Sequence, residues 1–179
     1  MKREELNDLR SVYSEMSQEY KSSLTSLPQV AATFKSPLFD TPSEEINVDL
    51  GGGKYDIATE YLKQRGIINL VIDPYNRSDD FNQRNENIAR ERGAYSVTVN
   101  NVLNVIKEPE ERENVIKRAK SFINEGGKCF FLIHYKKGET ARKTKKDSWQ
   151  NHMPPRDYVP EISKYFNNIR IVGNLIVAY

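Results

Sequence analysis

Between residues 45 and 76, two acidic residues and three glycines have the types and spacing of a nucleoside-binding site. Asp49 lies inside an apolar run, residues 51–53 are consecutive glycines, and Asp73 ends the next apolar run. Glycines let the backbone turn tightly and approach a ligand, because they have no Cβ. An acid at the end of the following strand can accept hydrogen bonds from the hydroxyls of a ribose. We therefore predict a nucleoside-binding site here, and a tight turn without a ligand is the alternative.

These residues must be positioned by a strand, a turn, a helix and a second strand. The apolar runs 45–50 and 67–73 predict the strands, and the periodic residues between them predict a helix that Gly66 ends. Such a βαβ unit has a right-handed crossover, which makes its strands parallel neighbours. The glycines are a poor match to a dinucleotide fingerprint, because position 56 is aspartate where that motif has its last glycine. They are also a poor match to a P-loop, because Tyr55 follows Lys54 where that motif has serine or threonine.

The rest of the sequence predicts one α/β domain behind an N-terminal cap. Residues 1–44 form the predicted cap, with an amphipathic helix over 2–22 and a connector that follows it, and residues 45–179 form the domain. Gly173-Asn174 predicts a hairpin between the last two strands. The further predicted strands are 94–100, 128–135, 168–173 and 175–179, and the further helices are 80–92 with Asp79 as N-cap, a helix from Pro109 that Gly126 ends, and 156–166.

The composition argues against several classes of protein. Cys129 is the only cysteine, so no internal disulfide forms, and we expect a cytoplasmic protein with this thiol in its core. Two histidines and one cysteine, far apart in the sequence, predict no zinc site. No apolar stretch approaches about 18 residues, so we expect no membrane span. A net charge of +2 does not by itself indicate a nucleic-acid-binding protein.

The glycine stretch resembles the class I S-adenosylmethionine (SAM)-dependent methyltransferases. Residues 48–53 stand where that family has its D-x-G-x-G motif, and Asp73 stands where it has its ribose-binding acid. The resemblance implies a Rossmann-like three-layer α/β sandwich, SAM as the cofactor, and methyl transfer as the reaction. The cofactor-binding residues that it implies are Asp49, Gly51, Gly52, Gly53, Asp73, Pro74 and Asn101.

The sheet of that family usually has about seven strands, whereas this sequence predicts six, mostly parallel, with the antiparallel hairpin at the C-terminus. The missing strand is the third of the family, at the edge of the sheet, or the fourth, in its centre. Loss of a central strand would leave buried backbone groups unpaired, whereas loss of an edge strand keeps the sheet continuous. We therefore predict that 94–100 pairs with the first strand, in the order second, first, third, fourth, sixth, fifth.

This order places Asn100 and Asn101 beside the glycine turn. In the family this position faces the methyl acceptor, so the resemblance implies Asn100 and Tyr75 as the residues at the reaction centre. The amino-methyltransferases of DNA carry Asp/Asn/Ser-Pro-Pro-Tyr/Phe there, whereas residues 100–103 read Asn-Asn-Val-Leu. The standard arrangement for base methylation is therefore not supported. The lost strand also carries the adenine-binding acid of many members, for which Asn101 is the candidate substitute.

A second resemblance is to methyltransferases associated with DNA phosphorothioation islands. These proteins have an Asp-Pro-aromatic sequence after the second strand, as residues 73–75 do here. Residues 102–106, Val-Leu-Asn-Val-Ile, and 109–112, Pro-Glu-Glu-Arg, are also similar to that group. The likeness extends over about residues 45–165, and its motifs are short.

The segment 136–148 is strongly basic and leaves the carboxyl end of a predicted central strand. It is either a solvated, mobile loop or an arm that binds the phosphates of DNA or RNA over the acceptor site. Trp149 follows it and would stack on a base or pack the loop down. The residues that we assign to the acceptor are Lys136, Lys143, Lys145, Lys146 and Trp149.

Two functions of different classes fit these features. The first is a SAM-dependent methyltransferase whose acceptor is unidentified, with nucleic acid as the candidate. The second is a non-catalytic module of the same fold that binds SAM, nucleic acid or protein, because a fold alone does not establish activity. A nicotinamide-binding protein is disfavoured by the glycine spacing.

Overall fold

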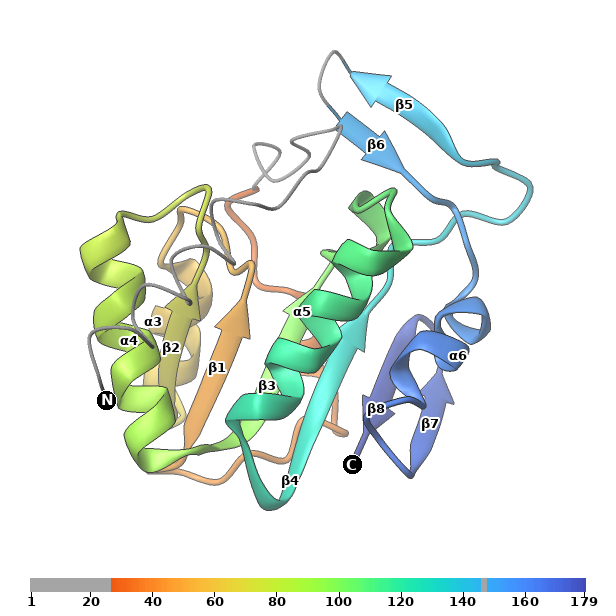
Figure 1. Ribbon diagram of the computed structural model, residues 1–179. Helices are drawn as coiled ribbons and strands as arrows, with labels where there is room; N and C mark the ends of the chain where they lie inside the picture. Colours follow the sequence, from red (N-terminus) through yellow and green to blue (C-terminus); the bar gives the residue numbers. More distant parts are fainter. Residues whose placement is uncertain (1–26, 146–147) are drawn as a thin grey trace.

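The structure is a computed structural model that describes residues 27–145 and 148–179. Its centre is a six-stranded sheet in the order β2-β1-β3-β4-β8-β7, as predicted (Figure 1). β1 to β4 are parallel, and β7 and β8 are antiparallel to each other, with β8 antiparallel to β4. The strands are β1 Ile46–Leu50, β2 Ile68–Ile72, β3 Ala94–Asn100, β4 Ile123–Leu132, β7 Ile169–Val172 and β8 Leu175–Ala178.

Helices and short helical turns cover both faces of the sheet, so the molecule has three layers (Figure 1). α4, α5 and α6 pack on one face, where Ala89, Ile116 and Ile162 join the larger apolar core. α2 and α3 pack on the other, where Phe34 and Leu62 contact a smaller apolar cluster. The elements are α2 Ala32–Lys35, α3 Ile57–Gln64, α4 Asp79–Arg92, η2 Leu103–Val105, α5 Pro109–Phe122, η3 Pro155–Tyr158 and α6 Val159–Ile162.

Three predicted boundaries are wrong. The N-cap of α4 is Ser78, whose hydroxyl accepts the Phe81 N–H at 3.3 Å, and Asp79 is already helical. The helix from Pro109 ends at Phe122, because Ile123 pairs with Ala94 and begins β4. The last helix is shorter than 156–166, since the chain forms the turn η3 followed by the single-turn α6.

The basic segment is not wholly a loop. β5 Arg142–Lys145 and β6 Ser148–Gln150 pair as a two-stranded antiparallel hairpin. Figure 1 shows this hairpin beyond the carboxyl ends of β3 and β4, as the sequence argument placed it. The amphipathic helix predicted over 2–22 and the residue Lys146 lie outside the described residues.

α4 packs on the sheet through polar side chains. Asn82 donates to the Asp73 carbonyl at 3.0 Å and accepts the Asp73 N–H at 2.8 Å, while Asn85 donates to the Val71 carbonyl at 2.8 Å. These asparagines are buried, and each satisfies backbone groups at the end of β2 that water would otherwise have to reach. The helix therefore fixes the backbone on which Asp73 stands.

Candidate functional site

A cavity of about 800 Å³ opens at the carboxyl ends of β1, β2 and β3. This is the edge of an open parallel sheet at which ligands bind. β1, the turn after β2 and the end of β3 each contribute predicted residues to its wall. The predicted residues that line it are Asp49, Gly51, Gly52, Gly53, Asp73, Pro74, Tyr75, Asn100, Asn101 and Trp149.

Each glycine of the turn after β1 is required by geometry. Gly51 and Gly53 have φ angles of +72° and +78°, which side chains with a Cβ rarely adopt. A Cβ on Gly52 would lie 2.6 Å from Asp49 Oδ2 and 3.0 Å from Val71 Cγ1, closer than packed atoms allow. The turn therefore brings the backbone directly over the Asp49 carboxyl.

Asp49 is a buried carboxyl, 2% exposed, at the floor of the cavity. Its Oδ1 accepts hydrogen bonds from Thr98 Oγ1 at 2.8 Å and from Asn100 Nδ2 at 3.3 Å. Burial raises the pKa of Asp49 to about 6, and the negative charge of Asp73 adds to this rise, while the bonds from Thr98 and Asn100 oppose it. The site thus places a second negative charge near Asp73 at neutral pH.

A row of buried polar side chains across β2, β1 and β3 leads to Asp49. Asn47 Nδ2 donates to Asn69 Oδ1 at 2.8 Å and to Thr98 Oγ1 at 3.1 Å, and Ser96 Oγ donates to Asn47 Oδ1 at 2.8 Å. Asn47, Ser96 and Thr98 have no exposed surface. Alternation along the strands places these residues on one face of the sheet, but nothing in the sequence indicated that they bond to one another. The row fixes the orientation of the side chains that hold Asp49.

Asp73 accepts four hydrogen bonds from the chain itself. Its Oδ1 accepts the N–H groups of Tyr75 and Asn76, each at 3.0 Å. Its Oδ2 accepts the Gly53 N–H at 2.8 Å and the Asn76 Nδ2 at 3.1 Å. The predicted ribose acid is therefore also the residue that joins the glycine turn to the turn after β2.

Arg77, which the sequence argument did not single out, joins the same two turns. Its Nε donates to the Gly53 carbonyl at 2.8 Å, and its Nη2 pairs with Asp56 Oδ1 at 2.7 Å. The Arg77 side chain is 11% exposed and that of Asp56 is 64% exposed, so the bond to Gly53 is partly buried, whereas the ion pair with Asp56 is exposed. Asp73 and Arg77 together hold Gly53 by both its N–H and its carbonyl.

The two residues predicted at the reaction centre, Asn100 and Tyr75, and the neighbouring Asn101 line the cavity. Asn100 is bonded at both ends of its amide, to Asp49 and to Thr33 Oγ1, which donates at 2.5 Å. Asn101 has a φ of +57°, and its N–H donates to the Leu132 carbonyl at 2.8 Å. Tyr75 is half-buried, and burial, followed by the carboxylates of Glu111, Asp73 and Glu108, raises its pKa.

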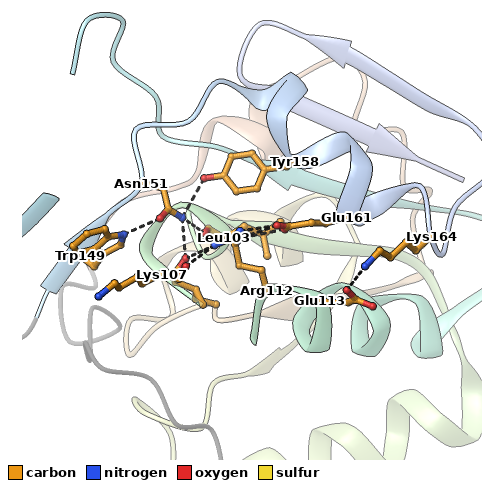
Figure 2. A network of polar contacts seen from close by, with 10 residues as sticks. Leu103, Lys107, Arg112, Glu113, Trp149, Asn151, Tyr158, Glu161 and Lys164 are labelled. Atoms are coloured by element: carbon orange, nitrogen blue, oxygen red, sulfur yellow. Dashed lines mark hydrogen bonds and ion pairs between the residues drawn. The ribbon is translucent and has the colours of Figure 1, made fainter. Parts of the chain in front are cut away.

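The hairpin contributes Trp149 to the cavity wall and is tied to the loop after β3. Trp149 Nε1 donates to Asn151 Oδ1 at 2.7 Å, and the Lys107 ammonium lies 5.1 Å from the centre of the indole ring. Figure 2 shows Asn151 between Trp149 and Leu103, whose carbonyl accepts from Asn151 Nδ2 at 3.0 Å. The Trp149 ring is therefore held in one orientation.

Two of the predicted acceptor-binding lysines, Lys136 and Lys143, are not among the residues that line the cavity. Lys136 pairs with Glu139 at 3.1 Å, and Arg142 pairs with the same carboxylate at 2.9 Å. Lys143 is exposed on β5, and Lys145 ends that strand. The structure brings Trp149 to the site, whereas Lys136 and Lys143 do not line it.

The described residues contain neither a cluster of metal-binding side chains nor a membrane-spanning helix. Within residues 27–145 and 148–179, no three His, Cys, Asp or Glu side chains are arranged to hold a metal ion. In the same part of the chain, no helix has both the length and the apolar content needed to cross a bilayer. Cys129 is fully buried and burial raises the pKa of its thiol, as expected of a core residue.

Three of the solved structures that resemble the chain are methyltransferases. The CcbJ methyltransferase from Streptomyces caelestis has a TM-score of 0.57 at 10% identity, over 94% of this chain and 93% of that one. A SAM-dependent methyltransferase from Clostridium acetobutylicum ATCC 824 has a TM-score of 0.51 at 12% identity, over 97% of each chain. The glycopeptide N-methyltransferase MtfA in complex with SAM has a TM-score of 0.50 at 9% identity, over 82% of this chain and 91% of that one.

At these identities the likeness shows the fold, which is that of the SAM-dependent methyltransferases. The predicted Rossmann-like α/β sandwich with a C-terminal antiparallel hairpin is therefore confirmed. No protein-family model and no curated protein sequence matches the chain.

Proposed function

We propose that the chain binds SAM in the cavity and transfers its methyl group to an acceptor. The observation that carries this proposal is the arrangement of the glycine turn between two buried acids, Asp49 and Asp73, at the carboxyl edge of a methyltransferase-type sheet. SAM carries a sulfonium and an ammonium group, and a site with two nearby carboxyls favours such a cation. That MtfA, with the same fold, was solved with SAM bound supports this choice of cofactor.

Each predicted site residue that lines the cavity is assigned a role in this proposal according to its position. Asp49, Asp73 and the glycine turn hold the cofactor, with Pro74 and Asn101 beside it. Catalysis consists mainly of placing the acceptor in line with the methyl group, so that a lone pair of the acceptor attacks as the bond to sulfur breaks. Asn100 and Tyr75 line the acceptor side of this arrangement.

The acceptor in this proposal is a nucleic acid, contacted through the hairpin. Exposed basic residues of the hairpin, such as Lys143, would neutralise backbone phosphates, and the Trp149 ring would stack on a base. Kinship with the methyltransferases of DNA phosphorothioation islands would fit an acceptor of this class. This kinship rests on the short motifs at residues 73–75, 102–106 and 109–112.

A specific observation favours the second candidate, a non-catalytic SAM-binding or nucleic-acid-binding module. Asn100 is bonded at both ends, and Asp73 uses both of its oxygens to hold the chain. A site whose polar groups already bond to one another has fewer groups to offer a substrate. Methyl transfer from labelled SAM to total nucleic acid distinguishes the two candidates, because the module would bind without transferring label.

Isothermal titration calorimetry with SAM and with its demethylated product, S-adenosylhomocysteine (SAH), tests the cofactor assignment. We expect both to bind, and we expect Asp73→Ala to abolish binding, because the variant loses the carboxyl that holds the glycine turn. Asp80→Ala, an exposed acid of α4, is the matched control and should bind as the parent does. If neither compound releases or absorbs heat with the parent protein, the chain does not bind this cofactor.

A further inference from the structure

The carboxylate of Asp73 has no free position for a ribose. An ionised carboxylate offers about four lone-pair positions. Asp73 fills them with the N–H groups of Gly53, Tyr75 and Asn76 and with the side-chain amide of Asn76. Asp73 is 2% exposed, so little of its carboxyl can be reached by a ligand in the cavity. A ribose hydroxyl can bond to Asp73 only if one of these donors leaves.

Three of the four donors are backbone groups that the fold holds in place. The Asn82 side chain accepts the Asp73 N–H at 2.8 Å and donates to the Asp73 carbonyl at 3.0 Å. Gly53 is held through its carbonyl by Arg77, at 2.8 Å. Release of any of these groups would require one of the two turns to open, which would cost several buried hydrogen bonds.

The fourth donor, the Asn76 amide, is on a rotatable side chain. Its contact with Asp73 Oδ2, at 3.1 Å, is the longest of the four. Asn76 is half-buried, so water can satisfy its amide when the side chain turns away. Its departure leaves the three backbone bonds to Asp73 in place.

We propose that the Asn76 side chain occupies the position on Asp73 that a ribose hydroxyl takes, and that cofactor binding displaces it. The proposal rests on the proposed function, since it assumes that the cavity binds the nucleoside of SAM. It adds that Asn76 competes with the ligand and weakens its binding. It also follows that Asp73 accepts one ribose hydroxyl, since only one donor can leave.

Asn76→Ala, in the full chain, tests this competition. Calorimetric titration with SAH should give a dissociation constant about two- to tenfold lower than that of the parent, the net worth of one hydrogen bond. Adenosine should show the same gain. 2′,3′-dideoxyadenosine, which lacks both hydroxyls, should bind the parent and the variant equally. Asn76→Ser, whose shorter side chain holds its hydroxyl farther from Asp73, is the second variant should Asn76→Ala fold poorly.

Asn87→Ala, an exposed asparagine of α4, is the matched control and should leave SAH binding unchanged. Unchanged or weaker SAH binding by a folded Asn76 variant would overturn the proposal while leaving SAM binding intact. An equal gain for dideoxyadenosine would also overturn it, because the displaced group would then not be a hydroxyl. Absence of SAH binding to the parent would instead refute the proposed function, and this proposal with it.

Discussion

Asp49→Asn should make the protein more stable at neutral pH and remove a pH dependence that the parent carries. The Asp49 carboxyl is buried under the glycine turn, and its pKa rises from 3.8 to about 6 on folding. Because the unfolded chain ionises this carboxyl more readily than the folded chain does, rising pH favours the unfolded state. The effect begins near pH 4 and is complete above about pH 7.

The size of this effect follows from the two pKa values. The rise from 3.8 to about 6 corresponds to about 3 kcal/mol of destabilisation at neutral pH, and to less than about 1 kcal/mol at pH 4. Asparagine has nearly the same shape and keeps an oxygen to accept from Thr98 and Asn100. The variant should therefore gain up to about 3 kcal/mol at pH 8 and little at pH 4.

Urea unfolding of the parent and of Asp49→Asn between pH 4 and pH 8, followed by circular dichroism, measures this difference. Asp80→Asn, at an exposed position of α4, should give a curve that runs parallel to that of the parent. If the free energies of Asp49→Asn and the parent also differ by a constant amount at every pH, the Asp49 carboxyl is not a strained, buried charge. The variant should bind SAM more weakly in the proposed site, because it lacks the negative charge that faces the cation.

Two further predictions concern the glycine turn and the hairpin. Gly52→Ala should lower the free energy of unfolding by about 1–3 kcal/mol, because its Cβ would lie 2.6 Å from Asp49 Oδ2; a stability equal to that of the parent in urea unfolding would show that the turn has room for a side chain. Replacing Lys143, Lys145 and Lys146 with alanine should weaken salt-dependent retention on DNA and RNA columns and flatten its dependence on salt. Retention equal to that of the parent would show that the hairpin does not contact phosphates.

The fold and the position of the cavity were largely predictable from the sequence. The glycine turn, the parallel pairing of β1 with β2 and the hairpin at Gly173 are encoded by residues close together in the chain. The strand order followed from one physical condition, that no buried strand can lose its partner. The local sequence pattern and this single condition were sufficient to predict the strand order, because few strand orders satisfy both.

The partners of the site residues were not predictable. Asp73 appeared to be a free acceptor for a ribose, whereas the structure shows four bonds from the turns on either side of it. Arg77 and Asn82 were not singled out from the sequence, yet they fix Gly53 and Asp73. These bonds join residues 9 to 24 positions apart, and their donors have no periodicity that a sequence reveals.

The sequence by itself therefore determined which strands form the central sheet, in what order they pair, and that a tight glycine turn lies between two acids. Only the tertiary structure decided what those acids do. Burial under Gly52 gives Asp49 its raised pKa, and the closeness of two turns makes Asp73 a structural acceptor before any ligand arrives. The burial of Asp49 and the bond from Gly53 to Asp73 depend on distances between atoms of different elements, which the pattern of residue types along the chain does not specify.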